Sequence, residues 1–313
     1  MGNTPTFCNL PIYLLLISML STISNAAEKF GQENARGIAA GYPGDEQIAS
    51  DARVLFADNF ELGDLKQWDE PRGSIATSNE APHAGKYCAY APMQRGENQG
   101  GDAIKWFMPG ADKVYVRFYV KFSIDYQYNH HFVTLLANQQ NNRWSAFGKA
   151  GMKPNGTYYS TGMEPWFAWG SNPPPGEVNL YSYYLDMEPD PKMDKYWGNA
   201  FFPSGPGKGV AASDQRVIPP RNQWQCWEFM LQANTAPEQA DGEQAMWVDG
   251  RLVGKFTGIR WRNDMELKIN CLWLQHYGYD GGDPTKQYWK QDQAVWFDDV
   301  VVATEYIGPQ VAL

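Results

Sequence analysis

The sequence predicts an all-β protein, and three observations support this prediction. Of the 313 residues, 15% are aromatic, which excludes a disordered chain. The 30 glycines and 21 prolines are spread along the whole chain, and both residue types disfavour helix interiors. From residue 52 onward, short alternating or β-branched runs are separated by Gly, Pro, Asn and Asp. We therefore expect two antiparallel sheets packed face to face around a large core.

The clearest strand is KVYVRFYVKF, residues 113–122. Side chains alternate between the two faces of a strand, so its apolar residues identify the core face. That face consists of Val114, Val116, Phe118, Val120 and Phe122. We expect further strands at 131–137, 179–186, 225–234, 244–249, 267–277 and 294–303. Asp249-Gly250 predicts a hairpin turn.

The beginning of the chain predicts export. Pro11 to Ile23 is apolar but shorter than the roughly 20 residues that span a bilayer. Small residues follow it, as signal peptidase requires, although an uncleaved anchor is the alternative. We expect a secreted or periplasmic protein with a signal peptide at 1–26, a flexible arm at 27–51 and a β-sandwich domain at 52–309.

The distribution of charge limits the classes of partner that the protein can bind. The net charge of −9 lies entirely beyond residue 26, and no basic run stands out, so a nucleic-acid partner is disfavoured. We expect a monomer that has no membrane contact once the signal peptide is removed.

Removal of the signal peptide leaves Cys88, Cys226 and Cys271, whose spacing does not fit a zinc motif. We expect free buried cysteines; one disulfide, with its pairing open, is the alternative.

A long Pro/Gly-rich insertion covers residues 187–222 and carries several aromatic side chains. A loop of that length is unusual in a compact domain and is often functional. A surface loop held down by its aromatic residues is the alternative.

Several strands carry polar and aromatic side chains opposite an apolar face. On 113–122 these are Tyr115, Arg117, Tyr119 and Lys121. Sugar rings stack on aromatic surfaces, and a guanidinium binds a carboxylate with two parallel hydrogen bonds, so this face suits an acidic polysaccharide. The alternative is an outward face with snorkelling Lys and Arg. The same theme recurs at Tyr181 and Tyr183, at Glu228 and Gln232, and at Trp273, Gln275, Tyr277 and Tyr279. Together they predict a concave substrate groove.

Two adjacent histidines, His130 and His131, follow the 113–122 strand. Consecutive residues face opposite ways on a strand, so at most one of them enters a groove. A histidine that titrates near neutral pH is a ready general base, and a structural role is the alternative.

Three segments together resemble a known family. Residues 221–250, RNQWQCWEFMLQANTAPEQADGEQAMWVDG, are similar to a segment of the jelly-roll polysaccharide lyases. KVYVRFYVKF resembles the cationic groove strand of these lyases, and VWFDDVVVATEYIGP resembles their closing strand. The likeness is to the broad group of alginate and glucuronan lyases, which have a concanavalin-like sandwich fold.

The resemblance implies β-elimination on a uronic acid polymer, with no cofactor for the chemistry. Arg117 and Gln275 would neutralise the carboxylate, His131 would be the base, with His130 or a Tyr as alternatives, and Lys121 would add positive field. Tyr277 would protonate the leaving oxygen, with Tyr119 or Tyr183 as alternatives. The expected substrate-binding residues are Tyr115, Tyr119, His130, Tyr181, Tyr183, Glu228, Gln232, Trp273 and Tyr279. A non-catalytic, lectin-like sandwich using the same groove is the alternative function.

Residues 55–68, LFADNFELGDLKQW, resemble the first strand of many sugar-binding sandwiches, which pairs with the last strand. Asp58, Glu61 and Asp298 would then place hard oxygens around one structural Ca²⁺. Ordinary strand-end and turn acids are the alternative.

Overall fold

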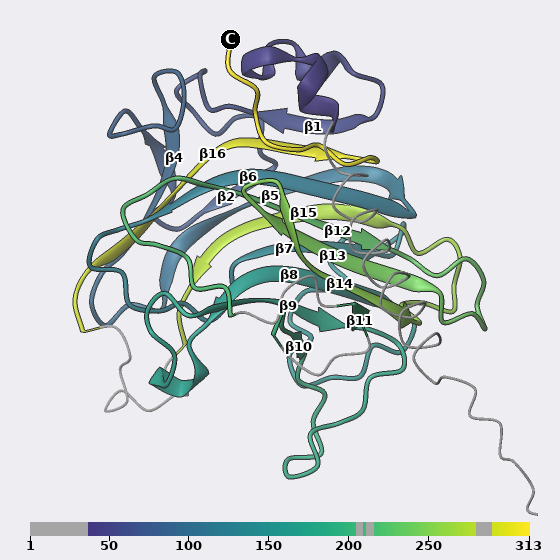
Figure 1. Ribbon diagram of the computed structural model, residues 1–313. Coiled ribbons are helices and arrows are strands. Elements are labelled where there is room, and N and C mark those ends of the chain that lie inside the picture. Colours follow the sequence, from purple (N-terminus) through teal and green to yellow (C-terminus); the bar gives the residue numbers. More distant parts are fainter. Residues whose placement is uncertain (1–36, 205–208, 211–215, 280–289) are drawn as a thin grey trace, which may run out of the picture. The chain divides into compact units, whose positions relative to one another are not determined.

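Two antiparallel sheets make up the computed structural model, as the alternating pattern predicts (Figure 1). The structure describes residues 37–204, 209–210, 216–279 and 290–313, which belong to one compact unit, Arg36–Leu313. The predicted signal peptide lies outside the described residues. Within the described part of the chain, no helix is long and apolar enough to cross a membrane.

The first sheet has nine strands in the order β11-β14-β13-β12-β6-β16-β4-β3, with β1 paired to β16. These strands are β1 (Val54–Asp58), β3 (Ala76–Ser78), β4 (Cys88–Met93), β6 (Lys113–Phe122), β11 (Gly209–Val210), β12 (Gln225–Gln232), β13 (Gly242–Val248), β14 (Arg251–Ile259) and β16 (Gln293–Ala303).

The second sheet has seven strands in the order β10-β9-β8-β7-β15-β5-β2. These strands are β2 (Glu70–Arg72), β5 (Gln99–Ala111), β7 (Val133–Asn138), β8 (Tyr158–Trp166), β9 (Glu177–Tyr183), β10 (Asn199–Phe201) and β15 (Ile269–Tyr277). Short 3-10 helices occur at η1 (Ile38–Gly41), η2 (Pro43–Asp45), η3 (Ile48–Ser50) and η4 (Ala168–Gly170).

The core lies between the sheets and confirms the predicted face of β6. Val114, Val116, Phe118, Val120 and Phe122 are all fully buried. They pack in one cluster with core side chains of the seven-stranded sheet, such as Leu135, Met163 and Leu274. The predicted hairpin is also confirmed, because Asp249 and Gly250 have φ angles of 51° and 74° between paired strands β13 and β14.

One polar cluster is buried between the sheets. Gln244 of the nine-stranded sheet accepts hydrogen bonds from Thr161 Oγ1 at 2.7 Å and Ser182 Oγ at 2.9 Å. Thr161 and Ser182 are also within hydrogen-bond distance of each other, at 2.9 Å. Because they lie on β8 and β9, the cluster holds the register of these two strands against the opposite sheet.

The described part of the predicted flexible arm, residues 37–51, is folded instead. The backbone N–H groups of Ile38 and Ala39 donate to the carbonyls of Tyr306 and Ile307 at 3.0 and 2.9 Å. Ile38, Ala39 and Ile48 are buried against the outer face of the nine-stranded sheet. Figure 1 shows this purple segment beside β1 and the C-terminal end of the chain. A polar, aperiodic segment is thus ordered by a few apolar anchors and by hydrogen bonds to a distant segment.

The three cysteines in the described region, Cys88, Cys226 and Cys271, are free and buried, as expected. Burial raises the pKa of Cys226 to about 12, so this thiol stays protonated.

Candidate functional site

The polar face of β6 does not line a groove, contrary to the prediction. Arg117 is fully buried, and Tyr115, Tyr119 and Lys121 are 8%, 7% and 6% exposed. Residues 37–51 and the C-terminal segment after β16 cover this face. Arg117 forms an ion pair with Asp45 of the covering segment. The alternating pattern showed which residues share a face and could not show that another part of the chain covers it.

The other predicted residues of this sheet also serve the fold. Lys121 Nζ donates to the carbonyl of Ala81 at 3.0 Å, and Tyr119 Oη accepts from the backbone N–H of Gln310 at 2.9 Å. The carboxylate of Glu228 accepts the backbone N–H groups of Ile307 and Gly308, both at 2.8 Å.

Gln232 lies on the outer face of the same sheet, at the end of β12, where it pairs with Lys113 and Glu243. Tyr115 packs against Trp247 and Tyr306. None of these side chains lies among the residues that line the pocket described next.

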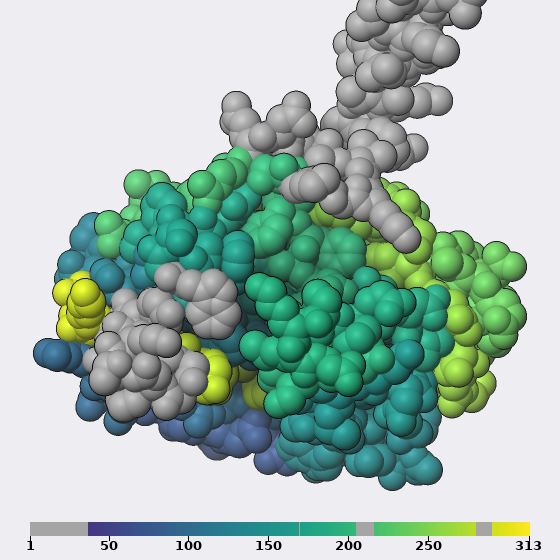
Figure 2. All heavy atoms as spheres, turned by 90° about the horizontal axis from the view of Figure 1, so that it is seen from below, coloured from purple at the N-terminus to yellow at the C-terminus, as the bar shows by residue number. Residues whose placement is uncertain are grey.

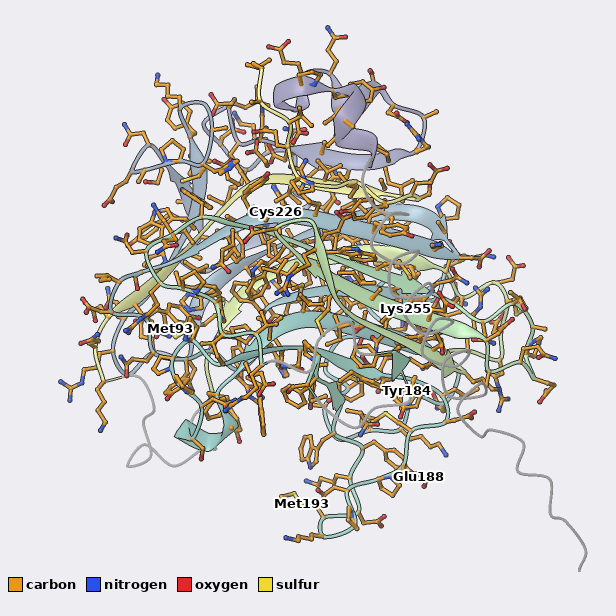
Figure 3. All side chains as sticks on the ribbon, in the orientation of Figure 1. Met93, Tyr184, Glu188, Met193, Cys226 and Lys255 are labelled. Atoms are coloured by element: carbon orange, nitrogen blue, oxygen red, sulfur yellow. The ribbon has the colours of Figure 1, made fainter. Side chains whose placement is uncertain are left out.

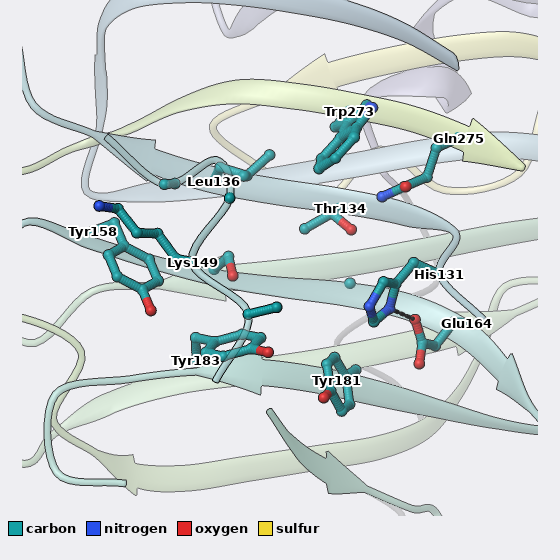
Figure 4. Close-up of a pocket in the computed structure, with 15 residues that line it drawn as sticks. His131, Thr134, Leu136, Lys149, Tyr158, Glu164, Tyr181, Tyr183, Trp273 and Gln275 are labelled. Carbon is teal, nitrogen blue, oxygen red and sulfur yellow. Dashed lines mark hydrogen bonds and ion pairs between the residues drawn. The ribbon is translucent and has the colours of Figure 1, made fainter. Parts of the chain in front are cut away.

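A pocket of about 180 Å³ lies on the outer face of the seven-stranded sheet (Figure 4). Strands β7, β8, β9 and β15 and the connection between β7 and β8, residues 139–157, supply its walls. Five of the predicted site residues line it: His131, Gln275, Tyr181, Tyr183 and Trp273. The structure therefore brings together five of the fourteen predicted residues and separates them from the six that lie on β6 and β12.

Small side chains form the floor of the pocket. Gly162 of β8 lies opposite Thr134 of β7 on one side and Tyr181 of β9 on the other. A Cβ atom at Gly162 would lie 2.6 Å from Thr134 Oγ1. The pocket therefore exists partly because this position of a central strand has no side chain.

His131 and a buried carboxyl group, Glu164, form a pair at one end of the pocket. His131 Nδ1 lies 3.2 Å from Glu164 Oε2, and Figure 4 marks this contact with a dashed line. The Glu164 side chain is 5% exposed, whereas that of His131 is 28% exposed toward the pocket. Burial lowers the pKa of His131 to about 4 and raises that of Glu164 well above its usual range. At neutral pH the imidazole is thus uncharged, and Glu164 fixes its orientation through one ring nitrogen.

Two tyrosines lie beside this pair. The rings of His131 and Tyr181 are 5.3 Å apart, and those of Tyr181 and Tyr183 are 5.7 Å apart. The backbone N–H of Gly198 donates to Tyr181 Oη at 2.8 Å. Burial raises the pKa of both phenols, so both are protonated at neutral pH and can donate a proton.

The insertion at 187–222 helps to build this wall. Its first part forms a small hairpin, in which Asp190 pairs with Lys195, and the backbone of Tyr196 then pairs with Gly151 next to the pocket. Figure 3 shows Met193 near the outer end of the projecting loop, and the teal and green atoms of this part of the chain form much of the side seen in Figure 2. The loop thus contacts the Tyr181 hydroxyl through the backbone of Gly198. This contact supports a functional role for the loop over the alternative of a surface loop held down by its aromatic residues.

Trp273, Gln275 and Lys149 complete the walls. Gln275 lies on the same side as His131 in Figure 4, whereas Lys149 lies at the other end, beside Tyr158. Gln275 is 5% exposed and offers amide N–H donors to the pocket.

The remaining predicted residues lie just outside the pocket lining. Tyr277 pairs with His131 through the backbone, and their rings stack at 6.0 Å. His130 lies beside both, and its ring is 5.3 Å from that of Tyr279, which is 38% exposed. Burial lowers the pKa of His130 to about 2. His130, Tyr277 and Tyr279 thus form a group of aromatic rings next to His131, outside the pocket lining.

Sequence reasoning missed Lys149, Tyr158 and Glu164. Glu164 lies in the segment YYSTGMEPW, which was not among the expected strands, yet this segment forms β8. The alternation of Ser160, Gly162 and Glu164 was a usable signal for a polar face. No local signal pairs Glu164 with His131, because 33 residues separate them.

The predicted calcium ligands are not brought together. Among the described residues, no group of three or more His, Cys, Asp or Glu side chains could hold a metal ion. Asp58 accepts hydrogen bonds from the Phe60 N–H and from the side chains of Gln67 and Trp68. Glu61 accepts from the backbone of Lys86 and Tyr87, and Asp298 from the backbone of His83, Ala84 and Asp299. Each carboxylate instead fastens a turn or a loop.

Comparison with known proteins gives no match to a family model and no significant match to a curated protein. Solved structures do match. An alginate lyase from Aplysia kurodai superimposes with a TM-score of 0.58 and 14% identity, over 81% of this chain and 100% of that chain. An alginate lyase from Chlorella virus superimposes with a TM-score of 0.57 and 14% sequence identity, over 80% of this chain and 99% of that chain. The alginate lyase Aly36B superimposes with a TM-score of 0.53 and 13% sequence identity, over 81% of this chain and 98% of that chain.

These identities are too low to transfer an activity, but the coverage spans nearly the whole of each neighbour. The chain therefore has the jelly-roll β-sandwich fold of the alginate lyases.

Proposed function

We propose that the protein is an exported polysaccharide lyase that cleaves a uronic acid polymer by β-elimination. The observation that carries this proposal is the pocket itself. It combines an uncharged histidine held by a buried carboxyl group, two protonated phenols and an amide within one small cavity. The fold shared with alginate lyases and the aromatic walls support the same conclusion.

β-Elimination requires three functions, and the pocket contains a group for each. The amide of Gln275 would hydrogen-bond the uronate carboxylate and stabilise the negative charge that develops next to it. His131, uncharged and oriented by Glu164, would remove the proton from the carbon that bears the carboxylate. Tyr181, whose ring centre lies 5.3 Å from that of His131, would donate its proton to the leaving glycosidic oxygen as the carbon–oxygen bond breaks.

The carboxyl content of the pocket disfavours hydrolysis. Glycoside hydrolases of the common type need two carboxyl groups on opposite sides of the scissile bond. Among the described residues that line the pocket, Glu164 is the one carboxyl group, and it is bound to His131.

Export is part of the proposal and rests on the apolar segment from Pro11 to Ile23 and the small residues after it. A large polymer cannot enter a cell, so an enzyme that cuts it would act outside the cytoplasm. Alginate is the first polymer to test, because the structural neighbours are alginate lyases.

The test follows the ultraviolet absorbance of the unsaturated sugar that only a lyase produces, on a panel of uronate polymers. Wild type should generate this signal, and His131→Ala and Tyr181→Phe should each lower kcat by about 10²–10⁴-fold without a matching loss of melting temperature. Arg251→Ala, at an exposed position at the start of β14 in the opposite sheet, is the control. Binding of a polymer with no product would favour the lectin-like alternative.

A further inference from the structure

A charged and aromatic cluster continues from the pocket across β15, β5 and β2. We call it the Arg72 cluster; its members are Arg72, Asp102 and Trp273. Trp273 Nε1 donates to Asp102 Oδ2 at 2.5 Å, and Arg72 forms an ion pair with the same carboxylate oxygen. The Arg72 guanidinium lies 5.9 Å from the centre of the Trp273 ring. Trp273 also lines the pocket, so the cluster and the pocket share a wall.

The strand register places the cluster in line with the pocket. Gln275 pairs with Asp102, and Asp102 pairs with Arg72, so the row runs across the strands from the His131 end outward. From β7 in the floor to β2 there are three strand spacings, about 14 Å in total. That span is longer than one sugar ring, so a polymer whose reacting sugar fills the pocket would place a neighbouring sugar over the cluster.

The cluster is built so that the cation stays accessible. Asp102 is 2% exposed, whereas the Arg72 side chain is 42% exposed. The Arg72–Asp102 contact runs through Nη2, and a guanidinium carries further N–H donors that suit a second carboxylate. The buried carboxylate receives both Arg72 and the indole N–H, so it holds the two side chains at a fixed angle to each other.

We propose that the Arg72 cluster is a second sugar subsite that takes the uronate next to the reacting one. Trp273 provides the surface on which that sugar ring packs, Arg72 binds its carboxylate, and Asp102 is the positioning residue for both. This inference rests on the proposed function for the identity of the polymer, and it adds that recognition requires a charged carboxylate one sugar away from the bond that breaks.

The experiment measures both binding and cleavage for wild type, Arg72→Ala and the control Arg251→Ala. The probes are sodium alginate, uronate oligomers of increasing length, and the propylene glycol ester of alginate, in which esterification removes the charge of the carboxyl groups. We expect Arg72→Ala to weaken binding to alginate and to raise KM about tenfold on long oligomers, with kcat unchanged. Binding to the ester should not change. Trp273→Ala should weaken binding to both polymers.

The outcomes separate this inference from the proposed function. If wild type binds without cleaving and Arg72→Ala weakens that binding, the subsite stands and the lyase proposal fails. If wild type cleaves while Arg72→Ala binds and cleaves both polymers as wild type does, the subsite is wrong. A loss in Arg72→Ala that is equal on the ester and on alginate would overturn the carboxylate-binding role, as would a wild type that binds no uronate polymer.

Discussion

Replacing Arg117 with methionine removes one half of a buried ion pair that fastens residues 37–51 to the nine-stranded sheet. The partner, Asp45, lies in η2 of the covering segment. Methionine fills much of the same volume without a charge, so the variant leaves the Asp45 carboxylate without its cation. We expect a loss of stability with no loss of turnover in the folded fraction, because Arg117 is remote from the pocket lining.

The size of the effect follows from the burial of the pair. Arg117 is 0% exposed and the Asp45 side chain 7% exposed, so water cannot replace the lost partner. Breaking a buried pair from one side costs about 3–5 kcal/mol. Nε and Nη1 of Arg117 have no hydrogen-bond partner among the described residues, so the pair is incompletely satisfied and we expect about 3 kcal/mol. At roughly 2–4 °C per kcal/mol for a large domain, Tm should fall by about 6–12 °C.

The assay is urea unfolding and thermal melting of Arg117→Met, Asp45→Leu and the double variant. Replacing both members of a buried pair by apolar residues is often neutral, so the double variant should recover most of the loss. The deficit of Arg117→Met should also shrink at low pH, where Asp45 binds a proton. If Arg117→Met unfolds like wild type, or if it melts normally but loses turnover, the structural role assigned to Arg117 is refuted.

Three further predictions concern the pocket and the covered outer face of the nine-stranded sheet. Gly162→Ala should lower kcat/KM strongly and cost about 1–3 kcal/mol of stability, because the new Cβ lies 2.6 Å from Thr134 Oγ1; initial rates and melting measure the two effects. The pH profile of kcat/KM should rise through about pH 4, where His131 loses its proton, and Glu164→Gln should move this limb. Burial raises the pKa of Glu228 to about 7, so the native state binds a proton that the unfolded state has lost. Unfolding free energy should therefore fall as pH rises from about 4.5 to 7, and Glu228→Gln should remove this slope, measured in urea.

The fold was predictable because its signal is local. Five apolar residues alternate within 113–122, and each was found in the core. The Asp249-Gly250 turn likewise depends on residues that adopt positive φ at low cost. Residues 37–51 show no hydrophobic periodicity, and their Pro43-Gly44 turn signal does not indicate what the segment packs against. Their order depends on hydrogen bonds to Tyr306 and Ile307, some 270 residues away, and no window of the sequence contains both partners.

Part of the candidate site was predictable for the same reason, because the face of a single strand is a local property. Tyr181, Tyr183, Trp273 and Gln275 lie on strands whose polar and aromatic face could be read directly, and they meet in the pocket. Which strands share a sheet could not be read. The polar face of β6 looked equivalent to the others, but β6 belongs to the opposite sheet.

The two outer faces explain why equivalent sequence patterns have different roles. On the nine-stranded sheet, both ends of the described chain cover the centre of the outer face, and the cations find partners within the chain: Arg117 binds the carboxylate of Asp45, and Lys121 binds the carbonyl of Ala81. The chemistry predicted for a substrate carboxylate is therefore present, but the carboxylate is the chain's own. On the seven-stranded sheet, Gly162 and Thr134 leave room above the strands, and the exposed guanidinium of Arg72 lies beside that space. A polar face becomes a binding site only where the rest of the chain leaves it uncovered, so the search for substrate contacts belongs on the seven-stranded sheet.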